Sequence, residues 1–299
     1  MPNTLAHIGV QTLLTRSLLK GADLKWIYLG CVIPDLPWIV RRLVMWAYPT
    51  IDQLWLQAYL LLQATLLFSV LLSAALASLS AHKLRTFSIL SSCSLVHLLL
   101  DATQTKWGNG VDLFIPLNWD MLNFGWYWPE HWFSYLMTLW GLALVLFYGR
   151  ESISTPPDIV LNRKNNLACL ILFAAYCLLP LTLIQQTRQH DSHYNGTLYS
   201  EQRSGKAIAF DRKSVKQAEQ GDWLVDLYGE WIPLDGVKGE GLQVVSVQGQ
   251  FSEQSRIAVS DYRVHPGLLR NYLSLVGLFL VLLVWGWSIA LYWHKQSKV

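Results

Sequence analysis

The chain has 299 residues, of which 53% are hydrophobic and 14% are charged, whereas soluble domains carry roughly 25% charged residues. This composition excludes an ordinary soluble protein and predicts an integral membrane protein. The net charge is +3, but residues 187–267 hold nine Lys or Arg against eleven Asp or Glu. Because nucleic-acid binding needs a basic surface, this acidic polar segment excludes nucleic acid as its partner.

The first 50 residues are expected to form short helices packed on or partly into a membrane bundle. Leu5 to Leu19 has a helical period, and Trp26 to Ile33 is an apolar run that ends at Pro34. Asp35 then stands where a helix N-cap is expected. None of these runs reaches the roughly 20 residues that a membrane-crossing helix needs.

Longer uncharged stretches predict the membrane spans. Five are expected: Gln53–Ala81, Thr86–Ala102, His131–Gly149, Asn165–Thr187 and Asn271–His294. The second is too short to cross a bilayer alone at about 1.5 Å per residue. Its Asp101 end should therefore lie at or just below the interface, buried by protein.

Residues 188–267 predict a small all-β domain, OB-like or another small barrel. Strand-like runs alternate there with Gly- and Asp-bearing turns; the runs are Lys206–Phe210, Trp223–Leu227, Leu242–Val247 and Ile257–Val259. His190 and His193 precede them and fit mobile surface residues better than a chelating pair.

The predicted fold class is mainly α. A polytopic helical membrane bundle (1–187) carries the inserted all-β domain (188–267), and a C-terminal transmembrane helix with a short cytoplasmic tail follows (268–299). Basic residues in short loops mark the cytoplasmic side, and with five spans most of them share one side: Lys83, Arg85, Arg150, Arg163, Lys164, Lys295 and Lys298. The N-terminal region, whose five Arg and Lys residues are the exception, and the β domain are then exoplasmic.

The stretch from Leu95 to Thr103 carries the pattern with the most chemical content. His97 and Asp101 stand four residues apart in an apolar, helix-forming run, which places both side chains on one helix face. A neutral imidazole nitrogen beside an ionised carboxylate is a good ligand pair for zinc or a similar divalent metal. The structural alternative is a helix that ends near the water surface, with His97 hydrogen-bonded to a neighbour.

Further residues stand in a recognisable order around this pair: His7, Pro34-Asp35, Thr103, Gly108 and Phe114-Ile115-Pro116. Over about residues 1–150 this order resembles the bacterial membrane-bound, metal-dependent hydrolases, also labelled LexA-binding, inner-membrane-associated hydrolases. More remotely, it is similar to zinc-dependent phospholipase C. The resemblance implies a bacterial inner-membrane location and a divalent metal, zinc above all, held by four ligands: His7, Asp35, His97 and Asp101.

The chain departs from this family at one motif. The family carries a His-Arg-Gly-x-Thr-His-Ser segment just before the first long span, whereas residues 52–66 here contain no histidine. Gln57 and Gln63 are poor zinc ligands, and Asp52 matches the position of neither histidine. Two groups of the family pattern are therefore missing.

The function expected from these residues is metal-dependent hydrolysis of an ester or phosphoester, such as a lipid, at the membrane surface. Glu130 or His131, at the start of the third span, is the candidate general base; the alternative for this pair is an acidic first helical turn beside an interfacial histidine. The alternative function is a degenerate family member that binds a protein partner through its β domain. A transporter is disfavoured, because the remaining spans carry no internal charges.

Overall fold

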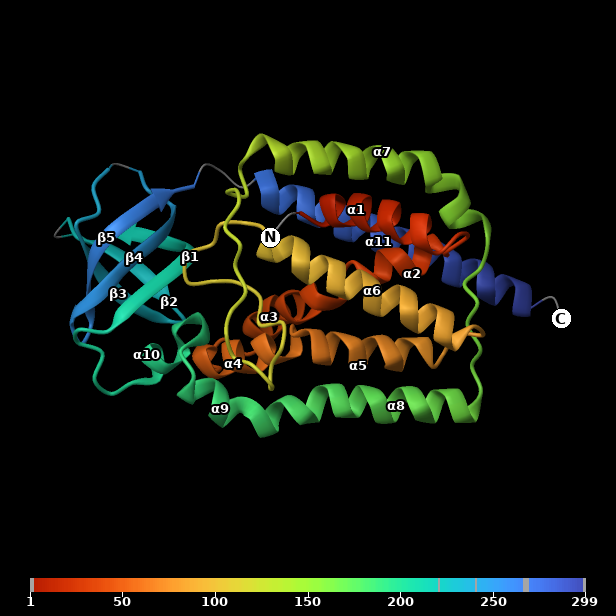
Figure 1. Cartoon of the computed structure of the whole chain (residues 1–299), viewed down its shortest axis with the longest axis horizontal. Coiled ribbons are helices and arrows are strands. Elements are labelled where there is room, and N and C mark those ends of the chain that lie inside the picture. The colour runs from red at the N-terminus through yellow and green to blue at the C-terminus, as the bar shows by residue number, and fades with distance from the viewer. Residues whose placement is uncertain (1–2, 220, 240, 266–268, 298–299) are drawn as a thin grey trace.

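A helical bundle and a small β-barrel make up the computed structural model of the chain, with the barrel at one end of the bundle (Figure 1). It describes residues 3–219, 221–239, 241–265 and 269–297. The chain leaves the bundle to form the barrel and returns to the bundle in its last helix. The predicted mainly helical fold with an inserted β domain is thereby confirmed.

Four helices among the described residues are long and apolar enough to cross a membrane. They are α6 (Lys83–Ala102), α7 (Trp132–Ser154), α8 (Arg163–Leu178) with its continuation through η2 (Leu179–Leu183) and α9 (Ile184–Gln189), and α11 (Leu269–Gln296). Large apolar side chains on their outer faces are exposed, among them Leu146, Phe147, Leu170 and Leu282. Contiguous apolar surface of this kind marks a membrane or protein contact.

The first predicted span is not a single helix. Residues 53–81 form α4 (Gln53–Gln63) and α5 (Leu66–Ala77), which meet at a bend of 66° and make one broken span at most. The break lies at Thr65, whose backbone is extended and whose hydroxyl donates to the Leu62 carbonyl. The uncharged sequence carries no signal for this break, because a threonine side chain can bond locally in either geometry.

The second predicted span is longer than expected. α6 begins at Lys83 and not at Thr86, because the charged residues before the apolar stretch are also helical. Its 20 residues cover about 30 Å. That length is enough to cross a hydrocarbon core, so the expectation that this helix is too short was wrong. Its Asp101 end is buried as predicted, with 4% of the residue exposed.

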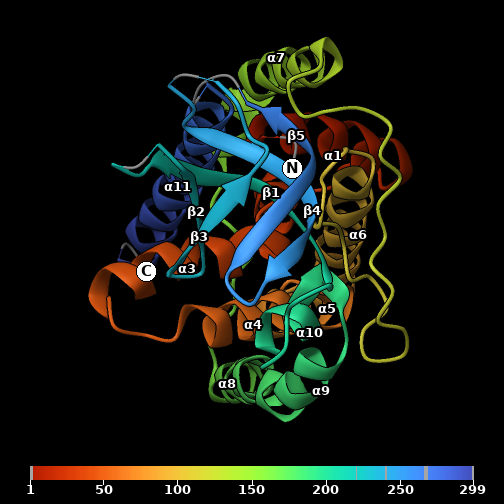
Figure 2. The same cartoon turned by 90° about the vertical axis from the view of Figure 1, so that its left-hand side faces the viewer.

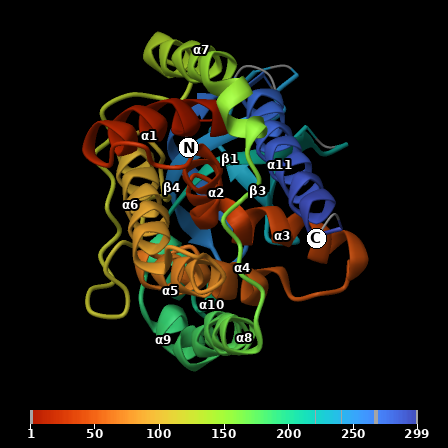
Figure 3. The same cartoon turned by 90° about the vertical axis from the view of Figure 1, so that its right-hand side faces the viewer.

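Short helices precede the spans, as predicted: α1 (Thr4–Leu18), α2 (Leu24–Gly30), the 3-10 turn η1 (Ile33–Asp35) and α3 (Leu36–Ala47). α1 packs against α6, α7 and α11 (Figure 3). Although α3 begins directly after Asp35, this side chain makes no capping hydrogen bond. The predicted N-cap position is therefore confirmed, but the Asp35 carboxylate is turned toward α6 and does not cap the helix.

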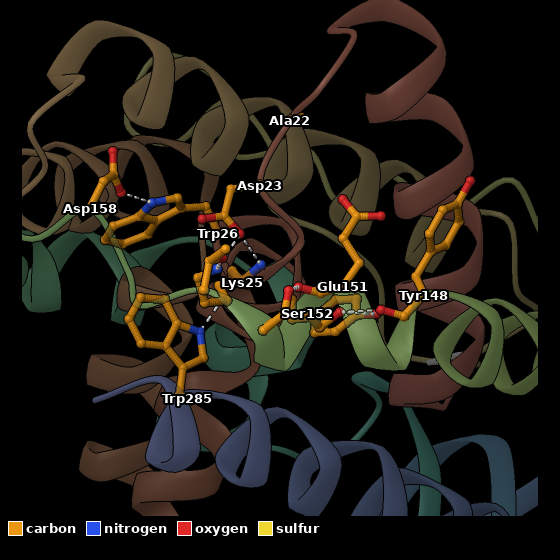
Figure 4. A network of polar contacts seen from close by, with 12 residues as sticks. Ala22, Asp23, Lys25, Trp26, Tyr148, Glu151, Ser152, Asp158 and Trp285 are labelled. Carbon is orange, nitrogen blue, oxygen red and sulfur yellow. Dashed lines mark hydrogen bonds and ion pairs between the residues drawn. The ribbon is translucent and has the colours of Figure 1, made fainter. Parts of the chain in front are cut away.

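Polar contacts tie the short helices to the long ones at the end of the bundle away from the barrel (Figure 4). The Lys25 ammonium, on a residue that is 1% exposed, lies 3.0 Å from Asp23 Oδ1 and donates to Thr155 Oγ1. The backbone carbonyl of Lys25 accepts a hydrogen bond from Trp285 Nε1. A charge buried at this depth is tolerated because it is paired.

Two further contacts show at which end of the bundle the N-terminal basic residues lie. Arg16 pairs with Glu151 near the end of α7, and Arg85 at the start of α6 donates to the Lys20 carbonyl. Arg16, Lys20 and Lys25 therefore lie at the end away from the barrel. The topology prediction, which placed them at the barrel end, is corrected for these three residues.

Five strands form the closed barrel: β1 (Ala207–Gln217), β2 (Trp223–Leu227), β3 (Glu230–Asp235), β4 (Val244–Glu253) and β5 (Arg256–Val264). Their order is β1-β2-β3-β5-β4, with β1 pairing β4 to close the barrel and β3 parallel to β5, as in OB-type Greek-key barrels. Inward side chains alternate with outward ones, and Val225, Ile232, Val245 and Phe251 are fully buried. The predicted small barrel is confirmed.

Two details of the predicted β domain are corrected. β3 was not predicted, because Pro233 argues against a strand interior; β5 pairs only with Leu234 and Asp235 of β3, so the proline lies outside that ladder. The barrel also starts later than residue 188, since residues 192–199 form the short helices η3 (Ser192–Tyr194) and α10 (Asn195–Tyr199). The predicted end at residue 267 lies outside the described residues.

The loop between α6 and α7 contacts the barrel as well as the bundle (Figure 2). Gly108 in this loop has φ +59°, and a Cβ there would lie 2.0 Å from the Ala209 carbonyl oxygen of β1. His193 lies 2.8 Å from Asp112 of the same loop and has a side chain that is only 9% exposed. His193 is thus a buried, paired residue, and the prediction of a mobile surface histidine is wrong.

We predict that Gly108→Ala separates the loop from β1. The positive φ costs about 1–2 kcal/mol for any L residue, and the clash with β1 adds about 1–3 kcal/mol of overpacking. Gly205→Ala is the matched control, because Gly205 has φ +79° but open space around its Cβ position. Denaturant unfolding of both variants in detergent measures the difference, and equal losses of stability would contradict the tight contact.

Candidate metal centre

Two helices bring three buried side chains together inside the bundle. His7 comes from α1, and His97 and Asp101 come from α6; one ligand atom from each lies within 4.8 Å of the others. α1 reaches this position because it lies directly on α7: a Cβ on Gly141 of α7 would be 1.9 Å from the Leu5 carbonyl oxygen. The position of His7 therefore depends on the contact between α1 and α7, two helices that are far apart in sequence.

The two imidazole rings are stacked, and both face the same carboxylate. The ring centroids of His7 and His97 are 3.8 Å apart with an angle of 6° between the ring planes. His7 Nε2 lies 3.3 Å from Asp101 Oδ1, and His97 Nε2 lies 3.7 Å from Asp101 Oδ2. The spacing of four residues thus places His97 and Asp101 on one face, as the sequence predicts.

A backbone contact fixes the protonation of the His97 ring. Its Nδ1 lies 2.7 Å from the Cys31 carbonyl oxygen. A carbonyl can only accept, so in a neutral ring the proton is on Nδ1 and the Nε2 lone pair points toward the cluster. This is the outer contact that metal-ligating histidines have, in which the second ring nitrogen donates to a carbonyl or carboxylate.

Asp35 completes the set of four predicted ligands. It ends η1, and its Oδ1 lies 3.6 Å from His97 Nε2. Its side chain is 20% exposed, against 6% for Asp101. Asp35 therefore lies beside His97, whereas the group whose ligand atoms are all within 4.8 Å of one another contains only His7, His97 and Asp101.

Several atoms of this cluster have no hydrogen-bond partner in the described part of the chain: both ring nitrogens of His7, His97 Nε2, Asp35 Oδ1 and Asp101 Oδ1. Each such buried group costs about 1–3 kcal/mol if it stays unsatisfied. Burial and the neighbouring His97 ring lower the pKa of His7 to about 4, so this imidazole is neutral at pH 7. Two imidazoles, which bind a metal in their neutral form, and two carboxylates fit zinc or a similar divalent metal.

A cavity of about 190 Å³ opens on His97 and Asp101, between the bundle and the barrel. Lys106, 3% exposed, lies on its wall with Nζ 3.8 Å from Asp101 Oδ2. The cavity thus opens on two residues of the cluster and carries the Lys106 ammonium beside them.

The segment without histidines lies on the wall of this cavity. Gln57, Leu61, Ala64 and Thr65, from α4 and the bend after it, line the space next to His97. They offer an amide, a hydroxyl and apolar groups, none of which is a good zinc ligand. The side chains in reach therefore suit one metal ion rather than several.

The structure does not bring the two candidate general bases to the cluster. Glu130 pairs with Arg212 of β1, and its Oε1 lies 3.0 Å from His265 Nδ1. His131 is exposed, and its Nδ1 accepts from the Phe133 backbone as the N-cap of α7. Both residues hold the barrel end of α7 in place, and neither lines the cavity.

Sequence reasoning missed two members of the site. Lys106 is the one cation in the sequence of the 103–130 loop, which is a weak signal, but its burial beside Asp101 is a property of the folded loop. The Cys31 carbonyl is a backbone group, so no residue type in the sequence predicts its contact with His97.

We predict that zinc stabilises the metal-free protein. A ligand at 100 times its dissociation constant adds about 2.7 kcal/mol, which raises the melting temperature by several degrees in thermal unfolding. Asp101→Asn should lose this shift, whereas His131→Asn, which removes an exposed histidine away from the cavity, should keep it. Equal shifts in all three proteins would show that zinc binds elsewhere.

Comparisons with protein-family models, with curated proteins and with solved structures found no match. They neither support nor refute the resemblance to membrane-bound hydrolases. The chemistry that can be assigned to this chain therefore rests on its own cluster and cavity.

Proposed function

We propose that this protein is a membrane-bound hydrolase that uses a divalent metal, zinc by its ligand set, to cleave an ester or phosphoester at the membrane surface. The observation that carries the proposal is the set of buried nitrogen and oxygen atoms on His7, Asp35, His97 and Asp101 that make no hydrogen bond and lie beside a cavity. Such a set is costly without a ligand and well suited to a cation.

The residues have distinct roles in this proposal. The two imidazoles and the two carboxylates would hold the metal, and zinc, when bound, would supply the Lewis acidity that ester hydrolysis needs. The Cys31 carbonyl holds the proton of His97 on Nδ1 and so keeps Nε2 directed at the centre. Lys106 places a positive charge where a negatively charged ester oxygen would lie.

The distribution of charge supports a membrane location and an orientation. Arg16 and Lys20 lie at the same end as Lys83 and Arg85, so the end away from the barrel is the basic one. Basic loops face the cytoplasm. We therefore place the barrel and the metal centre on the exoplasmic side of a bacterial inner membrane, with the apolar helices α6, α7, α8 and α11 as the spans.

The histidine-free wall favours one alternative. A chain that has lost half of a metal centre could keep the fold and serve as a membrane-anchored interaction protein through its barrel. Under this alternative the four ligands are remnants, and the barrel surface carries the function.

We predict near-stoichiometric zinc or manganese in detergent-purified protein, measured by elemental analysis. The double variant His97→Ala/Asp101→Ala removes two ligands, so it should lose the metal together with hydrolysis of p-nitrophenyl phosphate esters. His131→Ala is the control, because its side chain is exposed and outside the cavity.

Absence of metal from the folded wild-type protein would rule out the hydrolase. A cellular function that survives the double variant but not removal of residues 207–264 would support the interaction protein. Metal retained by the double variant would show that the ligands are assigned to the wrong residues.

We predict that Glu130→Gln lowers stability and leaves metal content unchanged. The variant leaves Arg212 with a weakened partner at the joint between α7 and the barrel, which costs about 1–3 kcal/mol. A general base would instead contribute about 10²–10⁴-fold to the rate. Measured hydrolysis rates that fall by such a factor, at unchanged melting temperature, would restore Glu130 as the base.

A further inference from the structure

The barrel supplies one wall of the cavity that leads to the metal cluster. Residues Ile208 to Asp211 and Lys213 of β1, and Leu227 and Tyr228 at the end of β2, line it opposite His97 and Asp101. A ligand in this cavity that reaches His97 and Asp101 can therefore contact the barrel. The charged side chains on this wall indicate which kind of ligand it could bind.

A β-bulge shapes this wall. The register between β1 and β4 shifts between Phe210 and Lys213, and Arg212 inside the bulge has φ +50°. A bulge breaks the alternation of side chains and is frequent next to active sites, where it redirects a side chain. Here it turns Arg212 to Glu130 of the bundle, while Lys213 lines the cavity.

The carboxylates that line the cavity all have partners. Asp112 Oδ1 accepts a hydrogen bond from the Ser192 hydroxyl, and its Oδ2 lies 2.8 Å from His193 Nε2. Asp211 accepts from the Ser246 hydroxyl at 2.7 Å. The third carboxylate is Asp101 of the metal cluster. Each carboxylate is thus already held by neighbouring side chains, and Lys106 and Lys213 are the two amines among the described lining residues that could bind an anion.

Lys213 is the opposite case. Within the described ranges no carboxylate lies at ion-pair distance from its Nζ, which lies 3.9 Å from the centre of the Tyr228 ring. Burial, with Arg41 nearby, lowers the pKa of Lys213 to about 8, so the amine is mostly protonated at pH 7. Lys213 is half-buried and its amine lies on the Tyr228 ring, so a bound anion would add a charged contact that no carboxylate of the wall supplies at ion-pair distance.

We propose that Lys106 from the bundle and Lys213 from the barrel together bind the anionic phosphate of the substrate, so that the substrate is a phosphoester rather than a neutral ester. The inference rests on the proposed hydrolase and assigns the barrel a role in it as part of the substrate-binding site. A neutral carboxylic ester would leave Lys213 unpaired, whereas phosphate oxygens accept charge-assisted hydrogen bonds from both amines.

Inorganic phosphate is the probe that tests this. Calorimetric titration of the full-length, zinc-loaded protein in detergent should show phosphate binding that Lys213→Met weakens at least about tenfold, the scale of one lost charged contact. Lys213→Arg, which keeps the charge, should retain most of the affinity. Lys216→Met is the matched control, because Lys216 lies in the same strand, with Nζ 3.8 Å from the Trp231 ring centre, but outside the cavity.

The zinc content of each sample separates the two proposals. Unchanged affinity in Lys213→Met, with zinc and melting temperature retained, overturns the anion site but not the metal centre. Phosphate binding that depends on Lys213 in a protein that holds no zinc overturns the hydrolase but supports the anion site. If Lys213→Met does not fold, Lys213→Gln and Lys106→Met replace it, and affinity unchanged in both overturns the inference.

Competition identifies the source of the phosphate group. Glycerol phosphate represents a soluble phosphoester, and a short-chain phosphatidic acid represents a lipid headgroup. Displacement of inorganic phosphate by either one supports the site and names the source, and displacement by neither overturns it.

Discussion

The burial of four ionisable side chains against one another is the constraint on which this structure depends. His7, His97 and Asp101 bring ligand atoms within 4.8 Å of one another, with Asp35 beside His97, in a chain whose composition is otherwise strongly apolar. Desolvation of such groups is expensive, and a fold keeps them when a ligand or a reaction needs them there. The stacked imidazoles, the carbonyl that fixes one ring and the carboxylate that faces both rings form a group that could hold a cation.

The rest of the bundle can be understood as the support for this point. α1 carries His7 to α6 because glycine lets it lie directly on α7, and η1 holds Asp35 beside the end of α6. The polar contacts of Arg16 and Lys25 anchor the same short helices at the opposite end. A site built from three elements is thus held rigidly, as ligand geometry requires.

The barrel is an integral part of this arrangement. It contacts the bundle through Gly108 and Glu130, and its bulged first strand forms a wall of the cavity. The histidine-free segment forms another wall, where Gln57 and Thr65 line the cavity. The described residues thus offer ligands for one metal ion, with Lys106 and Lys213 on the walls of the cavity beside them.

The sequence alone determined what depends on local pattern. Apolar runs fixed the helical class and most of the helix positions, alternation fixed four of the five strands, and the four-residue spacing fixed His97 and Asp101 on one face, because these signals come from neighbours along the chain. Only the tertiary structure decided the bend at Thr65, the strand that contains Pro233, the buried pairing of His193 and the removal of Glu130 from the site. These features depend on partners far away in sequence, such as Arg212 on β1, and no local pattern encodes which distant groups a side chain will meet.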